Sequence, residues 1–112
     1  MTDESGCRPD VGAVVLAPAG ELDLAATPRL RQLLQEAYAP GATVVLDFSD
    51  VGFLDSSALA VVLTAERRLR RSGGGLRVVN VGEAVLRVLR ICGLAERLVP
   101  ERPRLTTVPV RG

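Results

Sequence analysis

Apolar residues recur along this chain in two patterns: continuous runs typical of buried strands, and a spacing of three and four residues typical of helices. In residues 27–37 this spacing predicts a helix, with Thr27 as its N-cap and a proline at its first position. It predicts a second helix at 56–71 and a third that begins at Gly82 and ends at Gly93. Apolar, β-branched runs predict strands at 11–17, 43–48 and 76–80. Residues 18–20 interrupt the first run, so the segment up to Asp23 is predicted to be either a strand pair or one bent strand.

The alternation of strands and helices predicts an α/β fold in which parallel strands are joined by right-handed crossovers. We expect one mixed β-sheet of about four to five strands, with helices packed mainly on one face. The run at 43–48 is apolar almost throughout, which predicts a strand buried on both faces. Residues 49–54 are expected to form a loop, and residues 94–100 either a short helix or a last strand.

The expected domain spans residues 11–100. A polar N-terminal segment, 1–10, precedes it, and a proline-rich C-terminal tail, 101–112, follows it. The alternation of polar and apolar residues in the tail predicts one edge strand at 105–110.

Composition excludes several classes of function. The chain has 112 residues, the length of one domain, and its net charge of +1 argues against nucleic acid as a direct partner. It contains no histidine, which excludes a Ser-His-Asp triad, a Cys-His pair and a histidine-based zinc site. It contains no lysine either: all 14 basic residues are arginines. We therefore expect a protein that is not an enzyme and that holds no metal and no cofactor.

The sequence favours a cytoplasmic location. No apolar run approaches the ~18 residues of a membrane span, and the N-terminus is acidic and polar, unlike a signal peptide. Cys7 and Cys92 are far apart in the chain, and two isolated thiols make no disulfide framework, which favours a reducing compartment. Cys92 falls on the apolar face of the third predicted helix and is expected to be a small core residue.

The segment Asp55-Ser56-Ser57 is the strongest candidate for a site. It follows the strand at 43–48 and its loop and begins a predicted helix, and loops at the carboxyl ends of strands hold sites in open α/β sheets. The free N–H groups and the positive end of the dipole at a helix start stabilise an anion, so Ser56 is suited to carry a phosphate of about −1.5 to −2 charges. Beside Asp23 and Asp55, that charge would repel an acidic partner surface. The alternative is that Asp55 and Ser56 serve only as N-caps, which contribute about 1 kcal/mol each.

Four segments of the sequence resemble the STAS domain of bacterial anti-sigma factor antagonists. They are Gly20-Glu21-Leu22-Asp23-Leu24, Pro28-Arg29-Leu30, the strand 44–48, and Phe53-Leu54-Asp55-Ser56-Ser57-Ala58-Leu59. The resemblance spans about residues 11–99 and implies a single STAS-like domain that switches partners. It implies that the unphosphorylated chain binds an anti-sigma factor that is also a serine kinase. That kinase would phosphorylate Ser56, the phosphorylated chain would no longer bind, and a PP2C-type phosphatase would reset it.

The same resemblance assigns the neighbouring residues. It makes Ser57 the second hydroxyl of the motif and places Asp23 close to the phosphoacceptor, so that Asp23, Asp55, Ser56 and Ser57 form the expected partner-binding site. This chain has Ala58 and Ala60 where family members usually have glycines. Because alanine favours a helix over glycine by up to about 1 kcal/mol, this predicts a stiffer and bulkier helix start.

Two other functions remain open from the sequence. One is a STAS domain that binds its partners constitutively, as a scaffold or a transport-associated module, without phosphorylation. The other is an enzyme or small-molecule binder that uses Asp23, Asp55 and Ser56, which the absence of histidine, lysine and a metal-ligand set disfavours.

Overall fold

The computed structural model describes residues 13–99. This part of the chain contains five β-strands, which pair in parallel. Strands β1 (Ala13–Leu16), β3 (Thr43–Asp47) and β5 (Gly75–Val79) form one sheet in the order β1-β3-β5, and β2 (Ala19–Leu22) pairs with β4 (Asp50–Leu54). All three pairings are parallel, so the described strands form two parallel sheets, of three and of two strands, where one mixed sheet was expected. The expected α/β class is confirmed. The predicted N-terminal segment, Cys7 and the tail with its edge strand lie outside the described residues.

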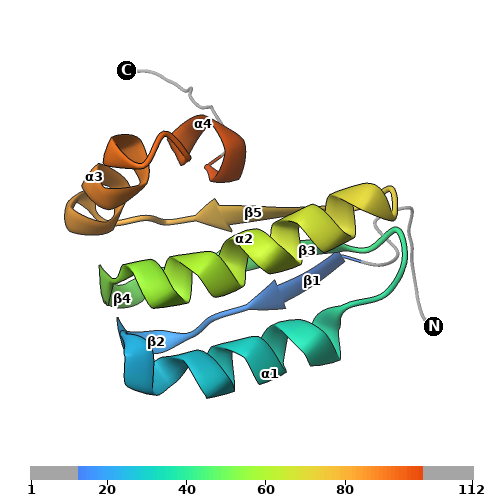
Figure 1. Cartoon of the computed structure of the whole chain (residues 1–112), viewed down its shortest axis with the longest axis horizontal. Coiled ribbons are helices and arrows are strands. Elements are labelled where there is room, and N and C mark those ends of the chain that lie inside the picture. The colour runs from blue at the N-terminus through green and yellow to red at the C-terminus, as the bar shows by residue number, and fades with distance from the viewer. Residues whose placement is uncertain (1–12, 100–112) are drawn as a thin grey trace.

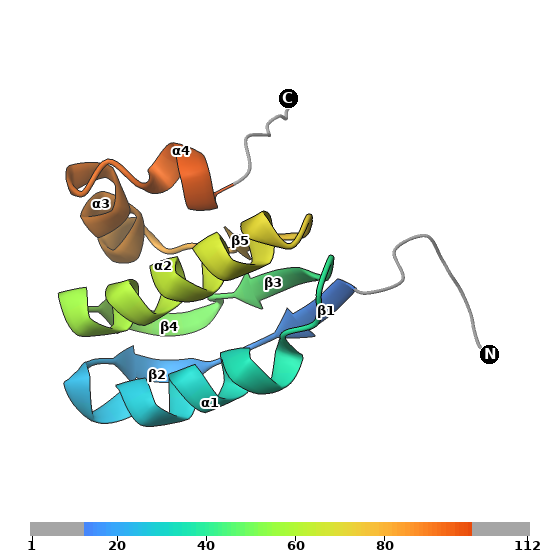
Figure 2. The same ribbon diagram turned by 45° about the vertical axis from the view of Figure 1, so that its right-hand side comes forward.

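The connections from β2 to β3 and from β4 to β5 are helical, whereas two residues join β1 to β2 and another two join β3 to β4. The 3-10 turn η1 (Leu24–Ala26) leads directly into α1 (Thr27–Ala37), and α2 (Ser56–Arg71) joins β4 to β5. Helices α3 (Glu83–Ile91) and α4 (Ala95–Leu98) follow β5, so the described part of residues 94–100 contains the short helix and not a strand. In both views α1 and α2 lie side by side across the strands, while α3 and α4 sit at the β5 edge (Figures 1 and 2). None of the helices in residues 13–99 combines the length and the apolar composition needed to cross a membrane.

The core lies between the helices and one face of the strands. Val44 and Leu46 of β3 are fully buried, and the residues that alternate with them, such as Val45, are half-buried. On β1, Val15 is 67% exposed. Helices packed mainly on one face are therefore confirmed, while the prediction that residues 43–48 are buried on both faces is wrong for the part of the chain described. The apolar run is continuous, but only every second side chain meets the helices.

Three local predictions are corrected by the structure. Residues 50–54 form a strand, β4, and not a loop. Thr27 is the first residue of α1 and not its cap, because η1 already leads into the helix and the Thr27 hydroxyl donates back to the Leu24 carbonyl at 2.8 Å. Cys92 is exposed, because α3 ends at Ile91 and the chain turns there, through Gly93 at a φ of +73°.

Glu66 is a buried acidic residue on the inner face of α2. It is 5% exposed, and its carboxylate lies 3.5 Å from Arg97 of α4 and 3.6 Å from Arg70 on the next turn of α2. A buried carboxylate is costly without a cationic neighbour. The ion pair between Glu66 and Arg97 therefore favours the packing of the short α4 against α2. The helical spacing of the sequence includes Glu66 without showing that it is buried.

The turn between α2 and β5 generates a testable prediction. A Cβ atom on Gly74 would lie 1.8 Å from the carbonyl oxygen of Ala42, a backbone atom that cannot move alone. Gly74→Ala should therefore lower the free energy of unfolding by about 1–3 kcal/mol or more, measured by chemical denaturation. The neighbouring Gly75→Ala is the control, since nothing lies within 4 Å of its added Cβ. A Gly74→Ala protein as stable as Gly75→Ala would contradict the close approach of the two chain segments.

Candidate phosphoacceptor site

The parallel pairing of β2 with β4 brings two carboxylates to one edge of the fold. Leu22 and Leu54 are partners in register, and each strand ends there, so Asp23 and Asp55 follow at equivalent positions. The amide of Asp55 donates to the carbonyl of Leu22 at 3.1 Å, which continues the pairing one residue past the strand. Strands β2 and β4, about thirty residues apart in sequence, thus end side by side (Figure 1). The helical segments η1 and α2 begin at these two strand ends.

Each of these aspartates caps the helical segment that follows it. Asp23 Oδ1 accepts from the amide of Ala26 at 3.1 Å and caps η1. Asp55 Oδ1 accepts from the amide of Ala58 at 3.1 Å and from the hydroxyl of Ser57 at 2.6 Å, and it caps α2. The interpretation of Ser56 as an N-cap is therefore wrong. Asp55 has the extended backbone of a cap, and Ser56 is the first residue of the helix.

The cap hydrogen bonds hold Asp55 in its charged form. The Ser57 hydroxyl lowers the pKa of this carboxyl most, and the amide of Ala58 lowers it further. Partial desolvation acts in the opposite direction but is outweighed. Hydrogen bonds to the ionised form of a carboxylate favour that form, so Asp55 is an anion throughout the neutral range.

Ser56 is left free by this arrangement. Its side chain is exposed on the first turn of α2, and the cap uses Ser57 and Ala58 instead. The hydroxyl of Ser56 can therefore be modified without breaking a hydrogen bond of the cap. A phosphate there would meet the free N–H groups of the first helical turn and would stand near the carboxylates of Asp23 and Asp55.

Two exposed apolar side chains that the sequence did not single out lie beside the aspartates. Leu24, directly after Asp23, is 70% exposed, and Phe53, two residues before Asp55, is 46% exposed. A β-bulge explains Phe53: Gly20 pairs with Val51 and Glu21 with Phe53, so Gly52 is extra and turns Phe53 outwards. The only indication of this bulge in the sequence is a glycine inside an apolar segment, which is a weak signal. These two side chains offer apolar surface next to the aspartates.

The carboxylate of Asp47 accepts several hydrogen bonds at the end of β3. Asp47 Oδ1 accepts from the Ser49 amide at 2.9 Å, from the Asn80 amide group at 3.1 Å and from the Ser49 hydroxyl. Within residues 13–99 no cluster of three or more acidic or cysteine side chains is placed to hold a metal. The four predicted partner-binding residues, by contrast, are all brought together: Asp23, Asp55, Ser56 and Ser57.

Comparison with known proteins identifies the family to which this arrangement belongs. The family model described as "Mlab, STAS domain" matches residues 7–100. The chain belongs to the STAS family. The resemblance inferred from its sequence segments is confirmed.

The relatives of this STAS domain are regulatory proteins. The anti-sigma-B factor antagonist of Bacillus subtilis (strain 168) is 32% identical over 78 residues, which cover 70% of this chain and 72% of the relative. The anti-sigma-F factor antagonist RsfA of Mycobacterium tuberculosis is 29% identical over 94 residues, which cover 81% of this chain and 73% of the relative. These relatives are named for binding regulation rather than for an enzymatic reaction.

Solved structures of antagonists have the same fold. An anti-sigma factor antagonist from Mycobacterium paratuberculosis superposes with a TM-score of 0.66 at 29% identity, covering 80% of this chain and 79% of the other. SpoIIAA in its unphosphorylated form superposes with a TM-score of 0.64 at 29% identity, covering 79% of each chain. SpoIIAA of Bacillus in its phosphorylated form gives 0.59 at 28% identity, covering 79% of this chain and 81% of the other. Fold and family are therefore those of the antagonists.

The cap predicts how the pKa of Asp55 responds to a substitution. Ser57→Ala removes the hydroxyl that lowers this pKa most, so the pKa should rise towards its ordinary value of 3.8. The measurement is a carboxyl carbon NMR titration. Ser49→Ala is the matched control, because the Ser49 hydroxyl lowers the pKa of Asp47 in the same way. Ser57→Ala should change only the pKa of Asp55, and Ser49→Ala only the pKa of Asp47. A change of both pKa values by one substitution would show that these pKa shifts do not arise from the local hydrogen bonds.

The same lowered pKa fixes the sign of a pH dependence. Because the folded-state pKa of Asp55 lies below the unfolded value, the cap contributes stability above about pH 4 and loses it as the pH falls through the folded pKa. Ser57→Ala should therefore be less stable than the wild type at pH 7, and the difference should narrow at lower pH. The stability difference between the two proteins could instead stay constant down to pH values below both the folded and the unfolded pKa of Asp55. That result would show that the Ser57 hydroxyl acts independently of the charge on Asp55.

Proposed function

We propose that this STAS domain is an anti-sigma factor antagonist whose binding is switched off by phosphorylation of Ser56. The observation that carries the proposal is the exposed Ser56 hydroxyl on the first turn of α2, outside the cap made by Asp55 and Ser57. The names of the relatives, which are antagonists of anti-sigma factors, supply the class of partner. Asp23, Asp55, Ser56 and Ser57 form the centre of the binding surface, with Leu24 and Phe53 as exposed apolar contacts.

The switch works through charge rather than through unfolding. A phosphate on Ser56 is compatible with the helix start, because free amides and the dipole of α2 stabilise an anion at that position. The same phosphate adds about −1.5 to −2 charges beside two carboxylates. A partner surface that tolerates Asp23 and Asp55 then meets a total charge about twice as large, together with a bulky group. Binding is lost while the fold remains.

The proposed partners follow from this cycle. The anti-sigma factor is itself a serine kinase, which transfers the γ-phosphoryl group of ATP to the Ser56 oxygen and releases ADP. A PP2C-type phosphatase hydrolyses the phosphate ester, which restores the hydroxyl and releases inorganic phosphate. The chain itself catalyses no step and needs no cofactor, acts in the cytoplasm, and binds neither nucleic acid nor a membrane.

The second candidate function is a constitutive interaction module without phosphorylation, acting as a scaffold or as a transport-associated partner. The observation in its favour is the family model, whose description names the STAS domain and no sigma-factor pathway. The two functions differ in one measurable respect, the effect of a negative charge at residue 56.

Phosphorylation at Ser56 is tested by incubating the chain with the anti-sigma kinase of its own organism and ATP, followed by peptide mass spectrometry. One phosphate per chain is expected, on Ser56. Ser56→Ala should remain unmodified, and Ser57→Ala, which keeps the exposed acceptor, should still be modified. Phosphate on another residue, with Ser56→Ala modified as efficiently as the wild type, would overturn the assignment.

A negative charge at residue 56 should weaken binding of the anti-sigma factor. Ser56→Asp is expected to raise the Kd at least about tenfold, which corresponds to about 1.4 kcal/mol. Ser56→Ala, which removes the hydroxyl without adding a charge, should bind nearly as the wild type does. Isothermal titration calorimetry measures both. Equal affinity of all three proteins would favour the constitutive module.

A further inference from the structure

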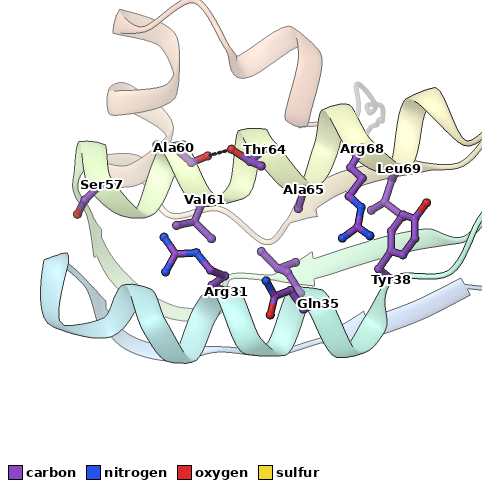
Figure 3. A pocket seen from close by; sticks show the side chains of 11 residues that line it. Arg31, Gln35, Tyr38, Ser57, Ala60, Val61, Thr64, Ala65, Arg68 and Leu69 are labelled. Carbon is purple, nitrogen blue, oxygen red and sulfur yellow. Dashed lines mark hydrogen bonds between the residues drawn. The ribbon is translucent and has the colours of Figure 1, made fainter.

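An open groove of about 240 Å³ runs between α1 and α2, next to the proposed switch (Figure 3). Its floor is apolar and is made by Leu34, Val61, Ala65 and Leu69. Polar and small side chains form its walls: Arg31, Gln35, Tyr38, Ser57, Ala60, Thr64 and Arg68. Ser57 is the one lining residue that the groove shares with the proposed binding surface around Ser56.

The groove is long and narrow. On α2 its lining extends from Ser57 to Arg68, which corresponds to about 16 Å at 1.5 Å per residue, or three helical turns. It is open along the two helices rather than enclosed, as Figure 3 shows. An elongated segment such as a helix of a partner suits this shape, because a helix can place side chains spaced at i, i+3 and i+4 along such a groove.

The charge of the groove is positive. Arg31 of α1 and Arg68 of α2 line it, and none of its lining residues is acidic. Both side chains lie over the groove in Figure 3, Arg31 towards its Ser57 end and Arg68 at the other end. The Arg68 guanidinium stacks on the ring of Tyr38, 4.0 Å from the ring centre. Stacking uses the face of a guanidinium and leaves its N–H groups free to donate to a carboxylate.

We propose that the groove between α1 and α2 docks an acidic amphipathic helix of a protein partner. The apolar side chains of that helix lie against half-buried Ala65 and the small exposed parts of Leu34 and Val61, and its carboxylates lie on Arg31 and Arg68. The proposed function supplies the identity of the partner, an anti-sigma factor, and the inference rests on it only for that identity. The groove adds a second contact area to the surface around Ser56.

A second copy of this chain does not suit the groove. The exposed charges on its own long helices are mainly arginines, among them Arg67, Arg70 and Arg71 on α2 and Arg87 and Arg90 on α3. A helix of this kind would place like charges on Arg31 and Arg68. Charge complementarity therefore selects an acidic helix from another protein.

The position of the groove connects it to the switch. Ser57 lines one end of the groove and is adjacent in sequence to Ser56, on the same first turn of α2. A phosphate on Ser56 places its charge at the mouth of a groove that holds carboxylates. The repulsion then acts on the docked helix as well as on the surface around Asp23 and Asp55. An acidic occupant thus explains why adding negative charge at this place would release a partner.

A synthetic peptide tests the groove without any kinase. The probe is a helix-forming peptide of about 15 residues with leucines at i, i+3, i+4 and i+7 and glutamates flanking them, titrated into the full-length, isotope-labelled chain. Amide NMR shifts are expected to change at residues on both helices, such as Gln35 and Thr64. A matched peptide with lysines in place of the glutamates should bind at least about tenfold more weakly. Shift changes elsewhere, equal binding of both peptides, or the same changes on concentrating the chain alone would overturn the proposal.

Charge-reversal variants with matched controls locate the contact. Arg31→Glu and Arg68→Glu should each weaken binding of the acidic peptide at least about tenfold, and their effect should diminish between about 50 and about 500 mM NaCl. The controls are Arg29→Glu on α1 and Arg67→Glu on α2, exposed residues outside the groove lining, which should change the Kd less than about twofold. Equal effects of groove and control variants would show only non-specific attraction and would refute the groove.

The two proposals can fail separately. If the chain binds the acidic peptide in the groove but is not phosphorylated on Ser56, the groove proposal stands and the switch proposal fails. A chain that is phosphorylated on Ser56 but gives no specific peptide binding would retain the switch and lose the groove. Ser56→Asp connects them, because it should weaken binding of the acidic peptide several-fold and should not weaken binding of the lysine peptide.

Discussion

The pairing of β2 with β4 is the constraint on which the site depends. Leu22 and Leu54 are buried partners in register, and the shared edge of the two strands places Asp23 and Asp55 at equivalent positions. Each carboxylate then caps the helical segment that begins there, η1 or α2. A slip of one residue in this register would turn the buried leucines outwards and separate the two acids. The core of the domain and the geometry of the site are therefore fixed by the same contact.

The division of roles between Asp55 and Ser56 separates the capping of α2 from the proposed switch. Asp55 accepts the cap hydrogen bonds from Ser57 and Ala58, so the helix start does not depend on the hydroxyl of Ser56. If Ser56 were the cap, its modification would remove a structural hydrogen bond and destabilise α2. With Asp55 as the cap, residue 56 can change its charge while the fold stays intact. This arrangement suits a reversible switch.

Much of this could be predicted from the sequence, and the exceptions have physical causes. The three long helices and the parallel order follow from periodicity and alternation, and the family from four sequence segments. Strand β4 was missed because Gly52 forms a bulge that breaks the alternation, and the exposure of Phe53 was missed with it. The roles of Thr27 and Ser56 were misassigned because a cap depends on which residue has the extended backbone, which the sequence does not specify. The burial of Glu66 depends on contact with α4, which is distant in sequence.

The alanines that replace the family's usual glycines have different roles in the structure. Ala58 is fully buried beneath the first turn of α2, so its methyl group faces the core and not an approaching kinase. Ala60 is exposed and forms part of the wall of the groove between α1 and α2. The expectation of a bulkier surface at the helix start therefore applies to Ala60 alone. Its methyl group narrows the groove by one carbon, one helical turn after Ser56. If the groove holds a partner helix as proposed, the side chain at residue 60 contributes to which helix fits, so this departure from the usual glycine bears on the choice of partner.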